Sequence, residues 1–249
     1  MNARYAIVTP YYRESPSVLR RCIDSVRNQT IEVEHFLIAD GVPQTVPTNV
    51  RHIALDRSHS DYGGVARAIG CILAISEKFH GIGLLDADNW LEPNHVEQCL
   101  QAAKSIGFDK CDYVVAGIAL RRPDETVIDI PLEPIDSHVD TNRFFFLPGS
   151  FHMLPLWGTM PKEASTIGDR FFYAVLASEG LSRAISEAPT VNYTCLWEQI
   201  YRRIGETPPA GAKPHVGGKQ IFDWKASLGP REKEIARRLM RINISWFNS

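Results

Sequence analysis

At residues 82–89 the chain reads Ile82-Gly83-Leu84-Leu85-Asp86-Ala87-Asp88-Asn89, a short apolar run that ends in two carboxylates. The apolar run predicts a buried strand, and open α/β sheets bind ligands at the carboxyl ends of such strands. Asp86 and Asp88 supply hard oxygen ligands, which Mg²⁺ and Mn²⁺ prefer. An aspartate-rich, solvated turn is the alternative interpretation, because a bare Asp-x-Asp pair is a weak motif.

The chain on both sides of this segment alternates β-branched runs with amphipathic stretches. Further strands are predicted at residues 6–8, 35–39, 50–55 and 113–116. Helices are predicted after Ser15-Pro16, after Gly63-Gly64 and from Pro93. In the second helix we expect the apolar residues at helical spacing to face the core, namely Val65, Ile69, Ile72 and Leu73. This alternation predicts an α/β fold, a Rossmann-like and mostly parallel central sheet flanked by helices.

The second part of the chain has a less regular pattern. From Arg121 onward it predicts short strands and loops, with helices at about residues 169–178 and 231–244. Residues 205–219 are rich in glycine and proline and predict a flexible surface loop. We therefore expect a smaller mixed region fused to the sheet within a single domain.

The amino-acid composition and charge exclude several classes of protein. The chain has 249 residues, 44% of them hydrophobic, and a net charge of -2, so it lacks the basic field that long nucleic acids require. Its five cysteines are scattered and odd in number, which argues against a disulfide framework or a zinc cluster and favours a reducing compartment. The pattern contains neither a signal peptide nor an apolar run long enough to cross a bilayer. We expect a cytoplasmic protein, soluble or peripheral at the membrane.

Polar residues close the first strands of the predicted sheet. Thr9-Pro10-Tyr11 follows the first strand and Asp40-Gly41 the second, so both belong at the edge that carries Asp86. An aromatic ring there can stack on a nucleobase, and an acid can accept hydrogen bonds from a base or ribose. Plain packing and an ordinary Asp-Gly turn are the alternatives.

The entrance of the second predicted helix is a further candidate for ligand binding. Glycines at Gly63 and Gly64 let backbone N–H groups approach an anion, and Arg67 lies one turn into the helix. Arg67 can reach a phosphate or form a structural ion pair with Asp86 or Asp88, and the two interpretations are compatible.

In this order and spacing, the segments resemble glycosyltransferase family 2, which has the GT-A fold. The likeness covers residues 6 to about 103 and rests on Ile7-Val8-Thr9-Pro10-Tyr11, Ser25-Val26-Arg27-Asn28-Gln29-Thr30, Leu37-Ile38-Ala39-Asp40-Gly41, Gly64-Val65-Ala66-Arg67 and Leu85-Asp86-Ala87-Asp88-Asn89. The resemblance implies a donor-binding half at residues 1–120 and an acceptor half at 121–249. It also implies a set of nucleotide-sugar contacts, namely Thr9, Pro10, Tyr11, Asp40, Gly64, Arg67, Asp86 and Ala87.

The same resemblance implies an acid at the start of a helix past the middle of the chain. Asp169, in Ile167-Gly168-Asp169-Arg170-Phe171-Phe172, is the match and so the candidate general base, although an ordinary helix cap is the alternative. Asp86 and Asp88 would hold Mn²⁺ or Mg²⁺. His215, inside the loop 205–219, is a candidate third ligand if that loop closes over the donor.

The resemblance implies a metal-dependent, inverting transfer of a sugar from a nucleoside diphosphate, with a UDP-sugar as the first candidate, to a glycan or lipid-linked glycan. Arg203 replaces the Trp of the Q-x-x-R-W signature of processive synthases, which predicts single transfers. The apolar stripe and basic side chains of the last helix suggest a membrane-surface contact as an alternative to packing. The open alternatives for function are an inactive nucleotide-sugar-binding or scaffold protein and a sugar nucleotidyltransferase.

Overall fold

The computed structural model describes residues 3–131, 135, 139–214 and 219–241. The strands are β1 (Tyr5–Tyr11), β2 (Val33–Ala39), β3 (Arg51–Ala54), β4 (Gly81–Leu84), β5 (Trp90–Leu91), β6 (Tyr113–Arg121), β7 (Phe144–Phe146) and β8 (Arg183–Thr194). The α-helices are α1 (Pro16–Arg27), α2 (Gly64–Ser76), α3 (His95–Ile106), α4 (Gly168–Ser178), α5 (Glu198–Arg203), α6 (Lys219–Ser227) and α7 (Pro230–Met240). The 3-10 helices are η1 (Thr141–Arg143), η2 (Pro148–Gly158) and η3 (Lys162–Ile167).

The strands form one sheet of order β3-β2-β1-β4-β7-β6-β8-β5. β1 runs parallel to β2 and β4, and β2 runs parallel to β3. β7 is antiparallel to both β4 and β6, while β6 and β8 are parallel to each other. The predicted mostly parallel α/β sheet is therefore confirmed, and the strands after β5 extend the same sheet. The division into donor and acceptor halves stays a prediction.

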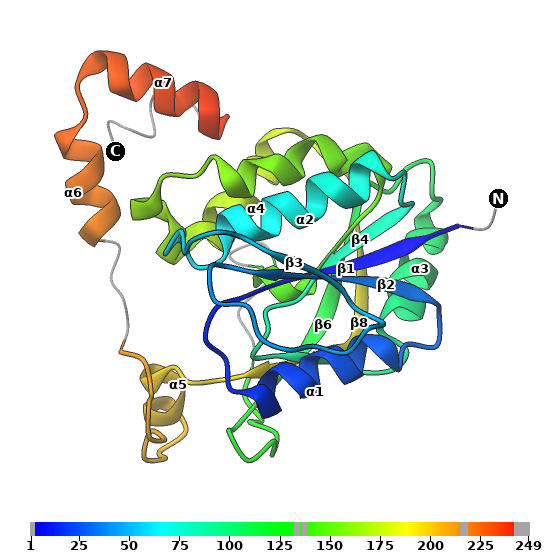
Figure 1. The fold of residues 1–249 in the computed structure, drawn as a ribbon. Coiled ribbons are helices and arrows are strands. Elements are labelled where there is room, and N and C mark those ends of the chain that lie inside the picture. The colour runs from blue at the N-terminus through cyan, green and yellow to red at the C-terminus, as the bar shows by residue number, and fades with distance from the viewer. Residues whose placement is uncertain (1–2, 132–134, 136–138, 215–218, 242–249) are drawn as a thin grey trace.

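Helices cover both faces of the sheet (Figure 1), with α1 and α3 on one face and α2 and α4 on the other. Successive residues of β1 point to opposite faces, as the pleat of a strand requires. Val8 packs in the cluster that contains α2 and α4, whereas Ile7 packs with Cys22 of α1. Because β1 lies in the middle of the parallel strands, both of its faces are buried.

Helix α2 packs on the sheet with a different face from the one expected. It buries its small residues and Arg67, while Ile72 is 47% exposed and Val65, Ile69 and Leu73 are only partly buried. A Cβ on Gly70 would lie 2.5 Å from Val8 Cγ1, so the helix approaches the sheet too closely for large side chains there. The predicted apolar face was wrong because close packing selects small residues, which hydrophobic periodicity does not register.

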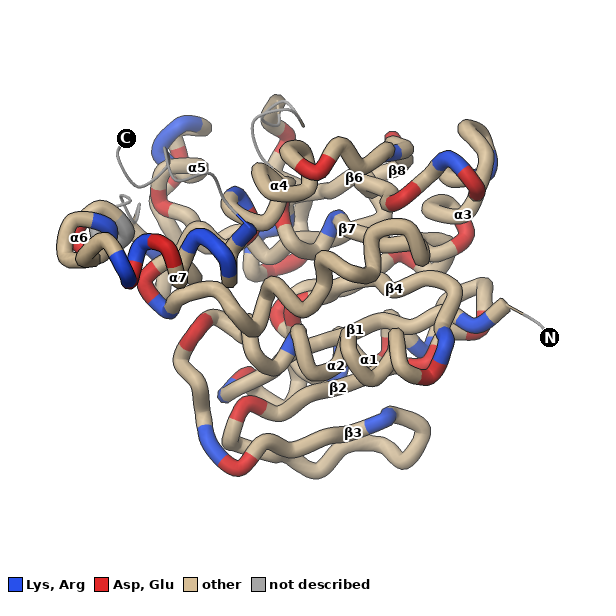
Figure 2. Tube along the Cα trace, turned by 90° about the horizontal axis from the view of Figure 1, so that it is seen from above, with Lys and Arg blue, Asp and Glu red and all other residues tan. Residues whose placement is uncertain are grey.

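The second part of the chain is more regular than its sequence pattern suggests. Helices α4 and α7 confirm the two predicted there, and residues 242–244 of the last predicted helix lie outside the described residues. The twelve-residue strand β8, the long 3-10 helix η2 and the helices α5 and α6 were not predicted. Both views place α6 and α7 at the end of the molecule opposite α3 (Figure 1, Figure 2). Within the described ranges, none of the helices is both long and apolar enough to span a membrane.

Candidate active site

Asp86 lies immediately beyond β4, at the carboxyl edge of the parallel strands, as predicted. Its Oδ1 accepts a hydrogen bond from Arg67 Nη2 of α2 at 2.6 Å, and its Oδ2 accepts one from Asn142 Nδ2 of η1 at 3.1 Å. The Asp86 backbone N–H donates to Asn142 Oδ1 at 2.5 Å. The carboxylate of Asp86 is thus held from two sides by side chains of other elements, which fixes its orientation.

Asp88 follows in a tight turn whose backbone is held by α1 and β8. The Asp88 carbonyl accepts hydrogen bonds from Arg21 Nη2 at 2.9 Å and from Thr194 Oγ1 at 2.6 Å. Burial, and after it the negative charge of Asp86, raise the pKa of the Asp88 carboxyl to about 6, whereas the ammonium of Lys213 opposes the rise. Two neighbouring, partly buried carboxylates create a site that favours a bound cation.

Arg67 is almost completely buried, with 3% of its surface exposed. Its guanidinium carbon lies 4.6 Å from the ring centroid of Trp157, in addition to the ion pair with Asp86. The Trp157 ring stacks on Phe172 of α4 with a centroid distance of 4.5 Å. The structure therefore shows the ion pair that the sequence left open, and it links Asp86 through Arg67 and Trp157 to the helix that carries Asp169.

The entrance of α2 lies against the end of β1. A Cβ on Gly63, whose φ is +79°, would lie 2.9 Å from Pro10, so the two chain segments touch. The Asp61 carboxylate accepts a hydrogen bond from Val65 N at 2.8 Å, and a Cβ on Gly64 would lie 2.8 Å from the Trp157 carbonyl oxygen. Pro10 and Gly64 are thereby brought together at the sheet edge, and one N–H of the helix entrance already has a partner.

Thr9 and Tyr11 lie in β1, which extends to Tyr11, and both are buried. Thr9 Oγ1 forms a hydrogen bond with His35 Nε2 at 2.9 Å, and the Tyr11 hydroxyl forms one with His52 Nε2 at 2.8 Å. Ala87 packs in the same cluster as Tyr11. These side chains contribute to the core beneath the edge, and their contact with a nucleotide stays a prediction.

Asp40 follows β2 and is 4% exposed. Its carboxylate accepts hydrogen bonds from His59 Nδ1 at 2.7 Å, from His59 N at 3.1 Å and from Ser58 Oγ at 3.1 Å. A Cβ on Gly41, at a φ of +82°, would lie 2.3 Å from Ser58 N, so only glycine fits where the segment 57–59 crosses this turn. Asp40 therefore anchors that segment at the site edge.

Asp169 lies in the first turn of α4, where its Oδ1 accepts a hydrogen bond from Arg170 N at 2.7 Å. The side chain is partly buried. Its charge contributes to a raised pKa of about 7 at Asp140, for which burial is the main cause and Asp86 the second. Asp169 is thus in electrostatic reach of the same polar group as the acid at the end of β4.

The sequence did not identify three polar residues of this region. Asp140 and Asn142, at η1, connect to Asp86 through hydrogen bonds of 2.7 and 3.1 Å from the Asn142 amide nitrogen. Lys213, from the predicted loop 205–219, is fixed by its own N–H, which donates to the Leu196 carbonyl at 2.6 Å. The Asp-Thr-Asn order at 140–142 is a capping pattern that could have marked η1, while nothing local marked Lys213.

The described residues supply some, but not all, of the ligands that a divalent cation requires. Asp86 and Asp88 offer hard oxygen ligands, and the pKa of Asp88 is raised first by burial and then by the negative charge of Asp86. Among the described residues, no group of three His, Cys, Asp or Glu side chains converges to hold a metal ion. His215, the third predicted ligand, lies outside the described residues.

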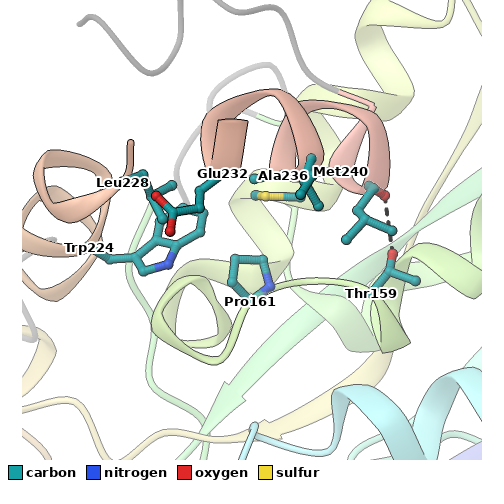
Figure 3. A pocket seen from close by; sticks show the side chains of 9 residues that line it. Thr159, Pro161, Trp224, Leu228, Glu232, Ala236 and Met240 are labelled. Carbon is teal, nitrogen blue, oxygen red and sulfur yellow. Dashed lines mark hydrogen bonds between the residues drawn. The ribbon is translucent and has the colours of Figure 1, made fainter. Parts of the chain in front are cut away.

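An apolar groove of about 230 Å³ lies away from these acids, between α6, α7 and the segment 159–161. Trp224 and Leu228 line one end, Met240 lines the other, and Thr159 Oγ1 donates to the Leu239 carbonyl at 3.2 Å (Figure 3). The groove marks where the C-terminal helices pack on the body, and its lining carboxylate, Glu232, accepts a hydrogen bond from Gly229 N at 2.5 Å at the start of α7.

Comparisons with known proteins identify a matching family and similar solved structures. A family model described as glycosyl transferase family 2 matches residues 6–156. No curated protein matches the sequence.

Similar solved structures include those of TarS from S. aureus. The crystal structure of TarS 1–349 in complex with UDP is 12% identical, with a TM-score of 0.56 over 95% of this chain and 70% of that chain. The complex with UDP-GlcNAc is 10% identical, with a TM-score of 0.58 over 95% and 71%. A longer TarS structure is 13% identical and is covered over 43% of its length. At these identities the likeness shows that the two chains share a fold.

Proposed function

The chain belongs to glycosyl transferase family 2, and from this membership we propose that it is a metal-dependent, inverting enzyme that transfers one sugar at a time from a nucleoside diphosphate. The first candidate donor is a UDP-sugar, and the acceptor is a hydroxyl of a glycan or lipid-linked glycan. The observation that carries this proposal is the pair Asp86 and Asp88 at the carboxyl end of β4, with Asp86 held in place by Arg67 and Asn142.

The two acids are the proposed metal ligands. Mn²⁺ or Mg²⁺ bound there would offset the negative charge that develops on the departing diphosphate. Asp86 is oriented for this role before any ligand binds, and Asp88 carries a carboxylate whose ionisation the fold disfavours unless a cation is near. Further coordination would come from diphosphate oxygens or from His215, which we retain as a proposal.

Lys213 is proposed to contact the diphosphate. Its ammonium lies 5.9 Å from the ring centroid of Trp197, and its charge acts on Asp88. The backbone on both sides is fixed, because Lys213 N donates to Leu196 O and Glu198 N donates to Lys213 O at 3.1 Å. A cation held at this position complements a diphosphate that lies beside Asp88.

Asp169 is the proposed general base. It would accept the proton of the incoming hydroxyl while that oxygen forms its bond to the anomeric carbon and the bond from that carbon to the diphosphate breaks. Attack opposite the leaving group inverts the anomeric configuration. The position of Asp169 in the first turn of α4, linked through Phe172 and Trp157 to Arg67, supports a fixed relation between base and donor.

The nucleoside is proposed to bind along the edge formed by β1, β2 and the α2 entrance. TarS, which shares the fold, has been crystallised with UDP and with UDP-GlcNAc, and this supports a uridine donor as the first candidate. Thr9, Pro10, Tyr11, Asp40, Gly64, Arg67, Asp86 and Ala87 are the proposed contacts. Since Thr9 and Tyr11 are buried, their contribution would be to shape the edge through His35 and His52.

The remaining chain is proposed to serve the acceptor, with residues 1–120 as the donor half and 121–249 as the acceptor half of one fused domain. Arg203 of α5 replaces the signature Trp of processive synthases, which supports single transfers. Five unpaired, buried cysteines support a reducing, cytoplasmic location. A lipid-linked acceptor would bring α7 to an anionic membrane surface. The exposed Ile235 and Leu239 favour this contact, whereas the mixed charges of α7 (Figure 2) weaken it.

The proposed function is tested in two steps with the purified chain. Thermal-shift measurements with UDP, GDP, CDP and dTDP in the presence of Mn²⁺ should show the largest stabilisation with UDP, because a ligand stabilises the fold that binds it. Hydrolysis of UDP-sugars and their transfer to glycan acceptors should then require Mn²⁺ or Mg²⁺. Binding without turnover would indicate a nucleotide-sugar-binding protein, and formation of UDP-sugar from UTP and a sugar phosphate would indicate a nucleotidyltransferase. A chain that no nucleoside diphosphate stabilises would contradict the proposal.

A further inference from the structure

The partly buried Asp140 and the buried Asn142 form a polar unit beside the end of β4 that the proposed mechanism does not use. Asp140 caps η1, with its Oδ1 accepting from Asn142 N at 2.9 Å and from Asn142 Nδ2 at 2.7 Å. Asn142 is fully buried, and the same Nδ2 donates to Asp86 Oδ2 at 3.1 Å. One amide nitrogen therefore bridges the two carboxylates and fixes the separation between Asp140 and the proposed metal ligand.

The position of Asp140 relative to the reacting groups follows from these contacts. Asp86 marks the diphosphate end of the site, and Asp140 lies one amide group away from it. Asp169, the proposed base, is the third contributor to the raised pKa of Asp140, after burial and Asp86. Asp140 is thus one amide group away from Asp86, at the leaving-diphosphate end of the reaction, and the charge of Asp169, at the attacking-hydroxyl end, acts on it. In a displacement at the anomeric carbon, the transferred sugar occupies the space between those two ends.

Only part of the hydrogen-bonding capacity of Asp140 is used within the described chain. Oδ1 accepts two bonds from Asn142, and no described residue donates to Oδ2. The nearest basic side chain on its own element is Arg143, whose Nε donates to the Ala116 carbonyl at 2.7 Å. A carboxylate oxygen is a strong acceptor for an O–H donor.

We infer that Asp140 is a specificity-determining residue, which accepts a hydrogen bond from a hydroxyl of the transferred sugar, and that Asn142 sets its distance from Asp86. This inference rests on the proposed function and adds a group that distinguishes one donor sugar from another. A hydroxyl on the sugar would satisfy Oδ2, and a sugar that lacks it would leave this carboxylate oxygen without a donor from the ligand. Such sites reject the deficient ligand strongly.

The test compares ligands that differ only in the sugar. Dissociation constants for UDP, UDP-GlcNAc, UDP-glucose and UDP-galactose are measured with Mn²⁺ on the wild-type chain and on Asp140→Asn. The UDP-sugar whose affinity for the wild type exceeds that of UDP by the largest factor is the donor used in the further measurements. The variant keeps an oxygen for the Asn142 contacts but loses the charged acceptor. We expect UDP affinity to stay within about twofold and the donor's advantage over UDP to fall by roughly tenfold or more.

Deoxy analogues of that donor supply an independent measurement on the unmodified protein. Deleting one particular hydroxyl should weaken binding to the wild type by roughly tenfold or more. The same deletion should weaken binding to Asp140→Asn much less, because that hydroxyl and the Asp140 carboxylate interact directly. If every deletion costs less than about twofold on the wild type, the inference is wrong even should the variant fail to fold.

Other outcomes separate this inference from the function on which it rests. Equal losses of UDP and of the donor in Asp140→Asn would show a merely structural role for Asp140 and would overturn the inference alone. An unchanged donor advantage would do the same. A wild-type chain that binds and transfers no nucleotide sugar would overturn the proposed function, and the inference with it.

Discussion

Arg67 donates from Nη2 to Asp86 Oδ1 over 2.6 Å and joins α2 to the segment that follows β4. The Arg67 side chain is 4% exposed and that of Asp86 is 33% exposed, so the ion pair lies at the boundary between core and site. A buried guanidinium requires a partner, and Asp86 together with the Trp157 ring meets that requirement. The same contact orients the carboxylate that we assign to the metal.

Replacing Arg67 by Met should therefore affect both stability and activity. The Arg67→Met variant loses the pair and leaves a partly exposed carboxylate, for which we expect a destabilisation of about 1–3 kcal/mol in urea unfolding. Because Asp86 is then free to rotate, the Mn²⁺ concentration needed for half-maximal transfer should rise. Arg238→Met is the matched control, since this side chain is 74% exposed and its loss should cost less than about 0.5 kcal/mol. Equal effects of the two substitutions would refute the structural role of Arg67.

Removing the negative charge of Asp88 should stabilise the metal-free protein. Its pKa of about 6 in the fold lies above the value of about 3.9 for an unfolded chain, so the fold disfavours the ionised form. This penalty is absent below about pH 4, grows between pH 4 and 6, and is complete above pH 6. Asp88→Asn should be more stable than wild type by about 1–3 kcal/mol at pH 8 in EDTA, and equally stable at pH 4. Transfer should fall by roughly a hundredfold or more.

Urea unfolding at the two pH values, with EDTA present, measures the effect of Asp88. Asp56→Asn, at an exposed position, serves as the control for a change of one charge. A variant that is less stable than wild type at pH 8 would show that Asp88 has a favourable partner in the fold.

His35 makes the fold sensitive to acid. Burial lowers its pKa to about 3, so between pH 6.5 and 3 the unfolded chain binds a proton that the native chain does not. The free energy of unfolding should fall as the pH falls, by about 1.4 kcal/mol per pH unit in that window. His95, whose pKa burial lowers to about 4, should add a similar slope. His35→Gln should reduce the slope measured between pH 6.5 and 5, whereas His80→Gln, at an exposed position, should not.

Asp169 should be required for turnover and dispensable for donor binding. Asp169→Asn removes the proposed base, and we expect transfer to fall by roughly a hundredfold or more while the dissociation constant of UDP changes by less than about twofold. Steady-state kinetics and calorimetry with UDP measure the two quantities. Glu163→Gln, at an exposed position one helix earlier, is the control and should leave both unchanged. A parallel loss of UDP binding would assign Asp169 to donor binding instead.

The features that could be predicted from the sequence are those set by local chemistry. Ser15 accepts a hydrogen bond from Val18 N at 3.4 Å and Pro16 begins α1, as the capping pattern predicted. The placement of Asp40 and Asp86 beyond β2 and β4 followed from a general rule, that parallel strands end at a common edge. Asp169 was selected through the family resemblance, since its local pattern alone indicates a helix cap.

The features that could not be predicted depend on residues far apart in the chain. Asp40 is held by His59, 19 positions away, and Asp86 is held by Asn142, 56 positions away. β1 continues to Tyr11, whose side chain is buried in one cluster with Leu19 and Ile23 of α1, while its contact with a nucleobase stays a prediction. A strand that is longer than its apolar run changes which side chains are free at its end, and no local pattern reports that length.

Lys213 provides the last prediction, because its proposed contact depends on the diphosphate. Lys213→Gln should weaken UDP binding by roughly tenfold, since a charge-assisted hydrogen bond is lost, and should weaken UMP binding by less than about twofold. Lys213→Arg should retain most of the affinity, and Lys162→Gln, at an exposed position, should have no effect. Removing the ammonium whose charge acts on Asp88 should also increase the dependence of UDP binding on Mn²⁺, as the metal becomes the main source of positive charge. Equal losses for UDP and UMP would place Lys213 near the nucleoside, and no loss for either would exclude it from the site.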